Sequence, residues 1–236
     1  MNRFRFSLIA MACALTFLLG GDALAQTMDR TGLIKEMQSL REQLQQKEQE
    51  FLAPSAEDRA AFAEFLRQPD TGLIRLVTRG KYDRILVMAG GGSYYSFARL
   101  TNEYGYGSDI ELQHEEFSVG FAGADWGYFT KLGDVPLETV TLDHPAVPFL
   151  ATLNASSPES GVREQQRLSQ SGVLINGLMY ARTVPALVNN TYVLRSISYH
   201  NSDVLVAVRV VRQDADGTMS LLWKMLKKFP TPELKP

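Results

Sequence analysis

Three consecutive β-type segments near the C-terminal end constrain the fold of this chain more than any other feature. Residues 191–199 and 204–212 are rich in β-branched and aromatic side chains, and a four-residue polar turn separates them. The second segment carries valine on both faces, which predicts a central strand buried on both sides. An Asp-Ala-Asp-Gly turn at 214–217 then leads into residues 219–229. Their apolar spacing also fits a helix, but the turn favours a third antiparallel strand.

The middle of the chain predicts further strands of the same sheet. Short apolar or alternating segments are separated there by turns rich in glycine, asparagine and aspartate. Four prolines between 134 and 158 indicate a surface connection, and polar helix formers at 159–170 predict a helix. The strands predicted in this region are 84–89, 93–100, 117–122, 128–132 and 172–181.

The N-terminal part predicts helices. Within residues 28–52, apolar side chains recur at alternating intervals of four and three residues, which is the spacing of a coiled-coil seam. We favour packing of this stripe on the domain that follows, with self-association through residues 28–52 as the alternative. Pro54 ends the helix and Ser55 is a suitable N-cap for a second one, so a helical hairpin is predicted over 26–70. The stripe consists of Leu33, Met37, Leu40, Leu44 and Phe51, interrupted at Lys47.

The first 25 residues resemble a secretory signal peptide. Arg3 and Arg5 precede an apolar run over 8–19, and Ala23-Leu24-Ala25 offers a cleavage site before Gln26. The run is shorter than the roughly 20 residues of a membrane span, and no second long apolar stretch follows it. We therefore expect a periplasmic or secreted protein without an integral membrane span.

The amino-acid composition excludes thiol-based sites and gives no indication of a nucleic-acid partner. The only cysteine, Cys13, lies in the predicted signal peptide, so the mature chain has no thiol for disulfides, zinc ligation or nucleophilic catalysis. Removal of residues 1–25 takes two arginines and one aspartate, leaving 22 basic and 25 acidic residues and changing the formal net charge from −2 to −3. This near-neutral balance gives no reason to expect nucleic acid as a partner.

No complete catalytic, metal-binding or nucleotide-binding motif is present. The segment from Gly91 to Tyr95 lacks the last glycine of a serine-hydrolase elbow, and a predicted strand rather than a helix follows the three glycines at 90–92. His114 lacks the second histidine that a zinc protease motif requires. We therefore expect no catalytic residues of these classes, no metal and no cofactor.

One region is unusually dense in aromatic and acidic residues, between 94 and 129. Exposed rings beside carboxylates can stack on sugar faces and bind their hydroxyl groups. The alternative is that about half of the rings belong to the core. The residues predicted to bind a ligand are Tyr104, Tyr106, Asp109, Asp125 and Trp126. Glu115 or Glu116 together with Asp125 is a candidate glycosidase pair.

These observations predict an α+β fold in which an N-terminal helical hairpin precedes a mainly antiparallel β-sheet domain. The expected divisions are a signal peptide (1–25), the hairpin (26–70), the β-rich domain (71–230) and a tail (231–236). The expected function is that of an exported, non-enzymatic binding protein or envelope-associated accessory protein, with a glycan or envelope component as partner. The alternative is a secreted carbohydrate-active hydrolase that uses a carboxylate pair.

Overall fold

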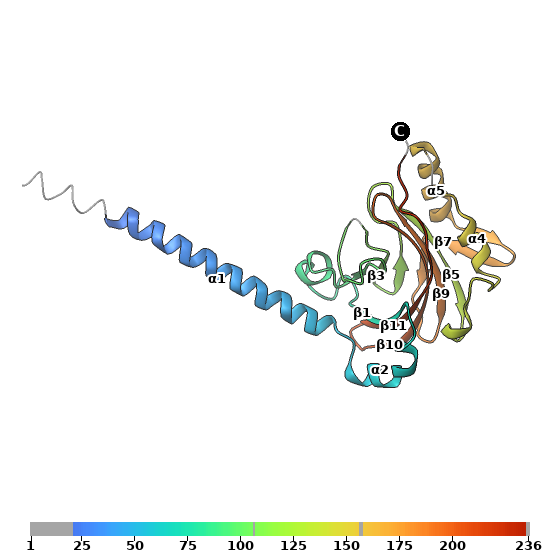
Figure 1. Ribbon diagram of the computed structural model, residues 1–236, viewed down its shortest axis with the longest axis horizontal. Coiled ribbons are helices and arrows are strands. Elements are labelled where there is room, and N and C mark those ends of the chain that lie inside the picture. The colour runs from blue at the N-terminus through green and yellow to red at the C-terminus, as the bar shows by residue number, and fades with distance from the viewer. Residues whose placement is uncertain (1–20, 106, 156–157, 235–236) are drawn as a thin grey trace, which may run out of the picture. The chain divides into compact units, whose positions relative to one another are not determined.

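The computed structural model describes residues 21–105, 107–155 and 158–234, and it has the predicted α+β class (Figure 1). The chain divides into two compact units, of which the first ends at Lys47 and the second begins at Glu48. The predicted helical hairpin at 26–70 is therefore divided between the two units. Residues 1–20 of the predicted signal peptide lie outside the described residues.

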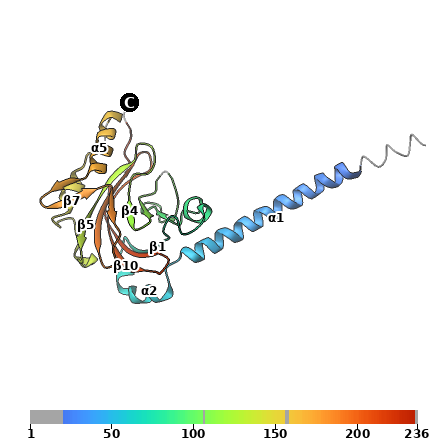
Figure 2. The ribbon, with the colours of Figure 1, turned by 180° about the vertical axis from the view of Figure 1, so that it is seen from behind.

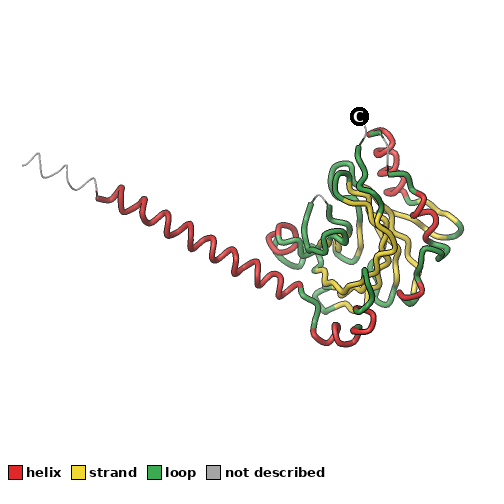
Figure 3. The backbone as a smooth tube through the Cα atoms, in the orientation of Figure 1, coloured by secondary structure: helices red, strands yellow, loops and turns green. Residues whose placement is uncertain are grey.

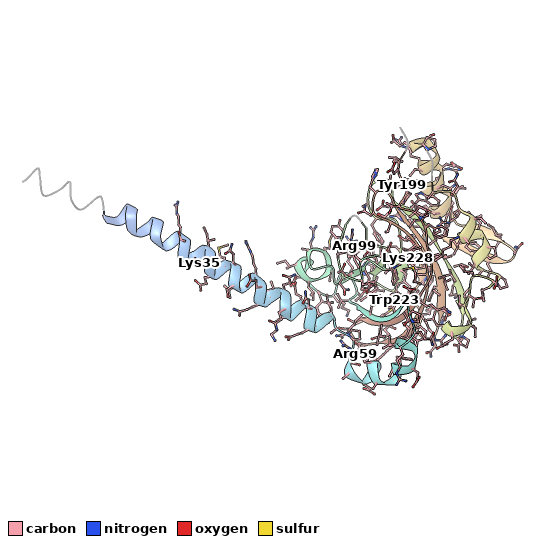
Figure 4. All side chains as sticks on the ribbon, viewed as in Figure 1. Lys35, Arg59, Arg99, Tyr199, Trp223 and Lys228 are labelled. Atoms are coloured by element: carbon pink, nitrogen blue, oxygen red, sulfur yellow. The ribbon has the colours of Figure 1, made fainter. Side chains whose placement is uncertain are left out.

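Helix α1 (Gly21–Leu52) confirms the predicted helix at 28–52 and begins earlier, before the predicted cleavage site. It ends at Leu52, two residues before Pro54, which cannot continue the backbone hydrogen bonding of a helix. We call Leu33, Met37, Leu40 and Leu44 the seam, and each of these side chains is about half exposed. Figure 4 shows side chains extending from α1 along the part that includes Lys35.

A seven-stranded antiparallel sheet forms the centre of the second unit, and its strands are yellow in Figure 3. The three strands predicted at the C-terminal end are confirmed, and β10 lies between β9 and β11. The first strand, β1, pairs with the last, β11. In spatial order the strands are β1 (Thr71–Leu76), β11 (Met219–Lys228), β10 (Ser202–Gln213), β9 (Thr191–Ser198), β5 (Trp126–Gly133), β7 (Leu178–Ala181) and β6 (Val173–Ile175).

A smaller antiparallel sheet covers one face of the large one (Figures 1 and 2). It contains β2 (Tyr94–Tyr95), β3 (Ile110–Gln113), β4 (Glu116–Ser118) and β8 (Thr183–Pro185). The core between the sheets takes Val204, Val206, Val208 and Val210 from β10. Because strand side chains alternate between faces, Leu205 and Ala207 point into a second core on the opposite face.

Short helices cover that opposite face. The helices are α2 (Ala56–Ala61), α3 (Ala63–Leu66), the 3₁₀-helix η2 (Leu137–Thr139), α4 (Val147–Thr152) and α5 (Glu159–Ser171). They contribute Phe65, Leu150 and Val162 to the second core. α2 is tied to the sheet because the Asp58 carboxylate accepts hydrogen bonds from Arg212 at 2.9 Å and Ser220 at 3.2 Å. The second unit therefore consists of small sheet, large sheet and helices in three layers.

Several predicted strands differ from the structure. Residues 84–89, predicted as a strand, instead form the π-helix η1 (Ile85–Ala89), because a short apolar segment has no period that separates a strand from a helical turn. The strand predicted at 93–100 is reduced to the two residues of β2, and the segment 172–181 is a hairpin of two strands. After η1, Gly91 has φ +71° and lies so close to the backbone of Glu103 that an added Cβ would be 2.4 Å from it. Only glycine lets these two loops meet.

Candidate functional site

Four polar residues form one row across the small sheet. The strand register places Tyr94 beside Glu111, Glu111 beside Ser118, and Ser118 beside Thr183. Their neighbours along each strand, such as Ile110 in β3, point to the other face and into the core. The row therefore lies on the face of the small sheet that is directed away from the large sheet.

The Glu111 carboxylate is the centre of a hydrogen-bonded network. Its Oε1 accepts hydrogen bonds from the Tyr94 hydroxyl at 2.7 Å and from Arg79 Nη1 at 2.8 Å, and its Oε2 accepts one from the Ser118 hydroxyl at 3.0 Å. The hydrogen bond to Glu111 raises the pKa of Arg79. Burial, together with the same carboxylate, raises the pKa of Tyr94. These groups are held in fixed positions at the base of a pocket.

Aromatic rings surround this network. The Tyr104 ring packs edge-on against Tyr94 with 4.9 Å between ring centroids, and Phe121 does so from another side at 5.5 Å. Tyr94 is buried, whereas Tyr104 is 51% exposed. The pocket has a volume of about 370 Å³. We call it the aromatic pocket, and its lining includes Arg79, Tyr94, Tyr104, Glu111, Phe121 and Arg182.

A second arginine is fixed at the same pocket. Arg182 follows β7 and donates from Nε to the Val119 carbonyl at 3.0 Å and from Nη2 to the Gly120 carbonyl at 2.7 Å. The described lining therefore holds two guanidinium groups, Arg79 and Arg182, and one carboxylate. The charge at the pocket is positive, although the formal net charge of the whole chain is −2.

The structure places the predicted ligand-binding residues in different environments. Tyr104 lines the aromatic pocket, and Tyr106 lies outside the described residues. Trp126 is 2% exposed, lies in the core beneath the helices and donates from Nε1 to the Tyr199 hydroxyl at 3.4 Å. Trp126 is therefore a core ring and not the exposed stacking ring that we expected, because the alternation along β5 directs its side chain into the core.

Asp109 and Asp125 are also buried and fix the backbone instead of facing the pocket. Asp109 Oδ2 accepts a hydrogen bond from the Phe97 N–H at 2.7 Å. Asp125 accepts from the Ser198 hydroxyl at 3.0 Å and from the Tyr199 N–H at 3.2 Å. Burial disfavours the charged carboxylate and raises the pKa of each residue to about 6.

The structure gives no support to the carboxylate pair considered for a glycosidase. Glu115 and Glu116 line a second pocket, of about 800 Å³, and Asp125 is absent from the described lining of that pocket. In the aromatic pocket Glu111 is the one carboxylate of the described lining, and its two oxygens are already hydrogen-bonded. A carboxylate pair needs a second acidic group across the scissile bond.

The incomplete motifs have structural explanations. The Ser93 hydroxyl is buried and donates to the Val77 carbonyl at 2.7 Å, so it is committed to the backbone. His114 has φ +55° and occupies the turn between β3 and β4. Over the described ranges, no group of three acidic, histidine or cysteine residues is arranged to hold a metal ion.

Sequence reasoning missed both arginines of the aromatic pocket. Arg79 and Arg182 lie far apart in the chain and outside the aromatic-rich region between 94 and 129. Their segments are brought together by the bridge between Arg79 and Gln113 at the end of β3 and by the pairing of β3 with β4 and of β4 with β8. The sequence signal that was available is alternation around Glu111, which predicts an outward-facing carboxylate between two core residues.

Comparison with known proteins does not assign the chain to a class, because no family model, curated protein or solved structure matches it. None of the helices in the described part of the chain has the length and apolar character needed to cross a membrane.

Proposed function

We propose that the protein is an exported, non-enzymatic binding protein whose ligand site is the aromatic pocket. The observation that carries this proposal is the half-exposed ring of Tyr104, supported edge-on by the buried ring of Tyr94. The Tyr94 hydroxyl is in turn held by Glu111. A rigid ring next to fixed polar groups suits a sugar, whose apolar face stacks on the ring while its hydroxyls form hydrogen bonds.

The charges at the pocket favour an acidic glycan of the cell envelope as the ligand. Arg79 and Arg182 supply two guanidinium groups, whereas Glu111 supplies one negative charge that Arg79 already neutralises. Guanidinium groups bind carboxylates and phosphates with charge-assisted hydrogen bonds. A saccharide with a uronic-acid or phosphate substituent would complement this lining better than a neutral one.

Export is supported by the order of the charged, apolar and small residues in the first 25 positions. We expect cleavage between Ala25 and Gln26 and recovery of the mature protein from the periplasm or the medium. Mass spectrometry of the recovered protein tests this expectation. A product that retains residues 1–25 would contradict the proposed compartment.

The binding experiment compares the parent protein with Tyr104→Ala on a panel of neutral and acidic oligosaccharides. Loss of the stacking ring should weaken binding of an acidic oligosaccharide about fivefold, since such ring contacts contribute about 1 kcal/mol. The melting temperature should hardly change because Tyr104 is half exposed. Leu142→Ala, which removes a side chain that is 47% exposed and does not line this pocket, is the matched control.

Two results would contradict the proposal. The first is a failure to bind as proposed: either the parent protein binds none of the saccharides, or the Tyr104→Ala and Leu142→Ala variants bind them equally well. The second is release of new reducing ends during incubation, with loss of that release in Glu111→Gln, which would show hydrolysis instead of binding alone.

A further inference from the structure

The seam of α1 is a narrow line of exposed apolar side chains. The exposed fractions are 49% for Leu33, 49% for Met37, 57% for Leu40 and 50% for Leu44. Lysine, arginine, glutamate and glutamine occupy most of the remaining circumference of this part of the helix. Burial of such a line against a complementary surface would remove apolar area from water, which is favourable.

The spacing of the seam fits a second helix. Leu33, Met37, Leu40 and Leu44 are separated by four, three and four residues, an average period of about 3.5. On a straight helix such a line drifts by about 20° per heptad, whereas in a left-handed supercoil it stays aligned with the partner helix. In heptad notation Leu33 and Leu40 occupy d positions, while Met37 and Leu44 occupy a positions.

Charges beside the seam select the partner and its direction. Glu36 is at g and Arg41 is at e of the next heptad, so in a parallel pair of identical helices each Glu36 faces the Arg41 of the other copy. An antiparallel pair instead brings Glu36 towards Gln43 and Arg41 towards Ile34, without opposite charges. In the described part of the chain no side-chain ion pair or hydrogen bond involving Glu36 or Arg41 is seen.

We propose that two copies of this chain associate through the seam as a parallel, two-stranded coiled coil over residues 30–47. The segment begins at Arg30 in an a position and ends at Lys47 in a d position. In a two-stranded coiled coil these long side chains can extend past the interface to water, whereas a larger bundle would enclose their charges. The association does not depend on the ligand of the aromatic pocket.

Single cysteines in the full-length chain test the direction of the helices. The background carries Cys13→Ser, which leaves the engineered cysteine as the only thiol whether or not residues 1–25 are removed. A parallel dimer brings identical positions together, so Leu33→Cys and Leu44→Cys should each form a disulfide-linked dimer under mild oxidation. Glu42→Cys, on the outer face at position f, is the control for random collision and should not cross-link at the same protein concentration.

Two outcomes of the cysteine experiment would overturn the proposal. Cross-linking of Leu33→Cys and Leu44→Cys at the rate of Glu42→Cys would show that the seam does not pair. A disulfide that forms only in a mixture of Leu33→Cys with Leu44→Cys would show an antiparallel arrangement.

A charge exchange tests the identity of the partner. Glu36→Lys sets a lysine against Arg41 of the other copy, and Arg41→Glu sets a glutamate against Glu36 of the other copy, so each variant alone has two repulsive pairs. Sedimentation should show a dissociation constant about tenfold higher than that of the parent for each variant alone. Mixing the two restores two attractive pairs in the heterodimer and should return the dissociation constant to within about twofold of the parent. A mixture that associates no better than its components, or a parent that sediments as a monomer throughout, would refute the coiled coil.

Discussion

The buried carboxylates Asp109 and Asp125 should make the protein more stable as the pH falls from 7.5 to 5. Burial raises the pKa of each to about 6, whereas an aspartate in the unfolded chain titrates near 3.9. The native state therefore binds the proton more tightly than the unfolded state does. The resulting stabilisation is fully present below the unfolded pKa and is lost as the pH rises through about 6.

The magnitude follows from these pKa values. Between pH 7.5 and pH 5 the native aspartate takes up most of one proton while its unfolded counterpart stays ionised. Each residue should then add about 1.4 kcal/mol to the free energy of unfolding, and the two together about 2.7 kcal/mol. Asp216, whose pKa is lowered, acts in the opposite direction only at more acidic pH, near and below its unfolded value.

Urea unfolding at several pH values between 5 and 7.5 measures this effect. The isosteric change Asp125→Asn removes the titrating group, retains one oxygen acceptor and should reduce the gain on acidification by about 1.4 kcal/mol, the contribution of that one carboxyl. Asp109→Asn should do the same independently, because the two carboxylates share no hydrogen-bond partner among those described. A parent free energy that falls on acidification, or variants with the parent's pH dependence, would refute this account of the buried carboxylates.

Three further predictions concern stability. Trp126→Ala should reduce the free energy of unfolding by about 3–5 kcal/mol because the ring is 2% exposed, and a change below about 1 kcal/mol in urea unfolding would contradict its position in the core. Arg195→Ala should cost about 3–5 kcal/mol because it leaves Asp203, to which Arg195 donates at 2.8 and 2.9 Å, buried without its cation. A melting temperature equal to the parent's would contradict this. Deletion of residues 26–47 should leave a cooperative thermal transition, whereas deletion through Leu52, which is 6% exposed, should lower its midpoint.

The sequence predicted the large sheet well because its pattern is local. The valine-rich segment at 204–212 has both faces apolar, and β10 is buried on both sides between two neighbouring strands. The N-terminal helix was likewise evident from heptad spacing and from the position of Pro54. In each case residues close in sequence determine the element.

The aromatic pocket was harder to predict because it depends on register between distant strands. The alternation within residues 93–100 places Tyr95 and Phe97 on one face, and both lie in the core between the sheets. It did not show that Trp126 points inward, nor that Arg79 and Arg182 converge on the pocket of Glu111. Tyr104 in a turn and Trp126 in a strand belong to the same aromatic-rich region, and composition does not separate them. Only the burial of each side chain in the structure distinguishes the two.

The pairing of the first strand with the last has a consequence for how the chain folds during synthesis. Leu76 of β1 pairs with Met219 of β11, so the large sheet cannot be completed until nearly the whole chain has left the ribosome. Contacts this distant in sequence also slow folding, since a long loop must be closed before they form. Until β11 has been made, the edge of β10 with which it pairs stays without a partner strand. A chain that has not yet completed its sheet is suited to pass through a translocation channel, as the proposed export requires.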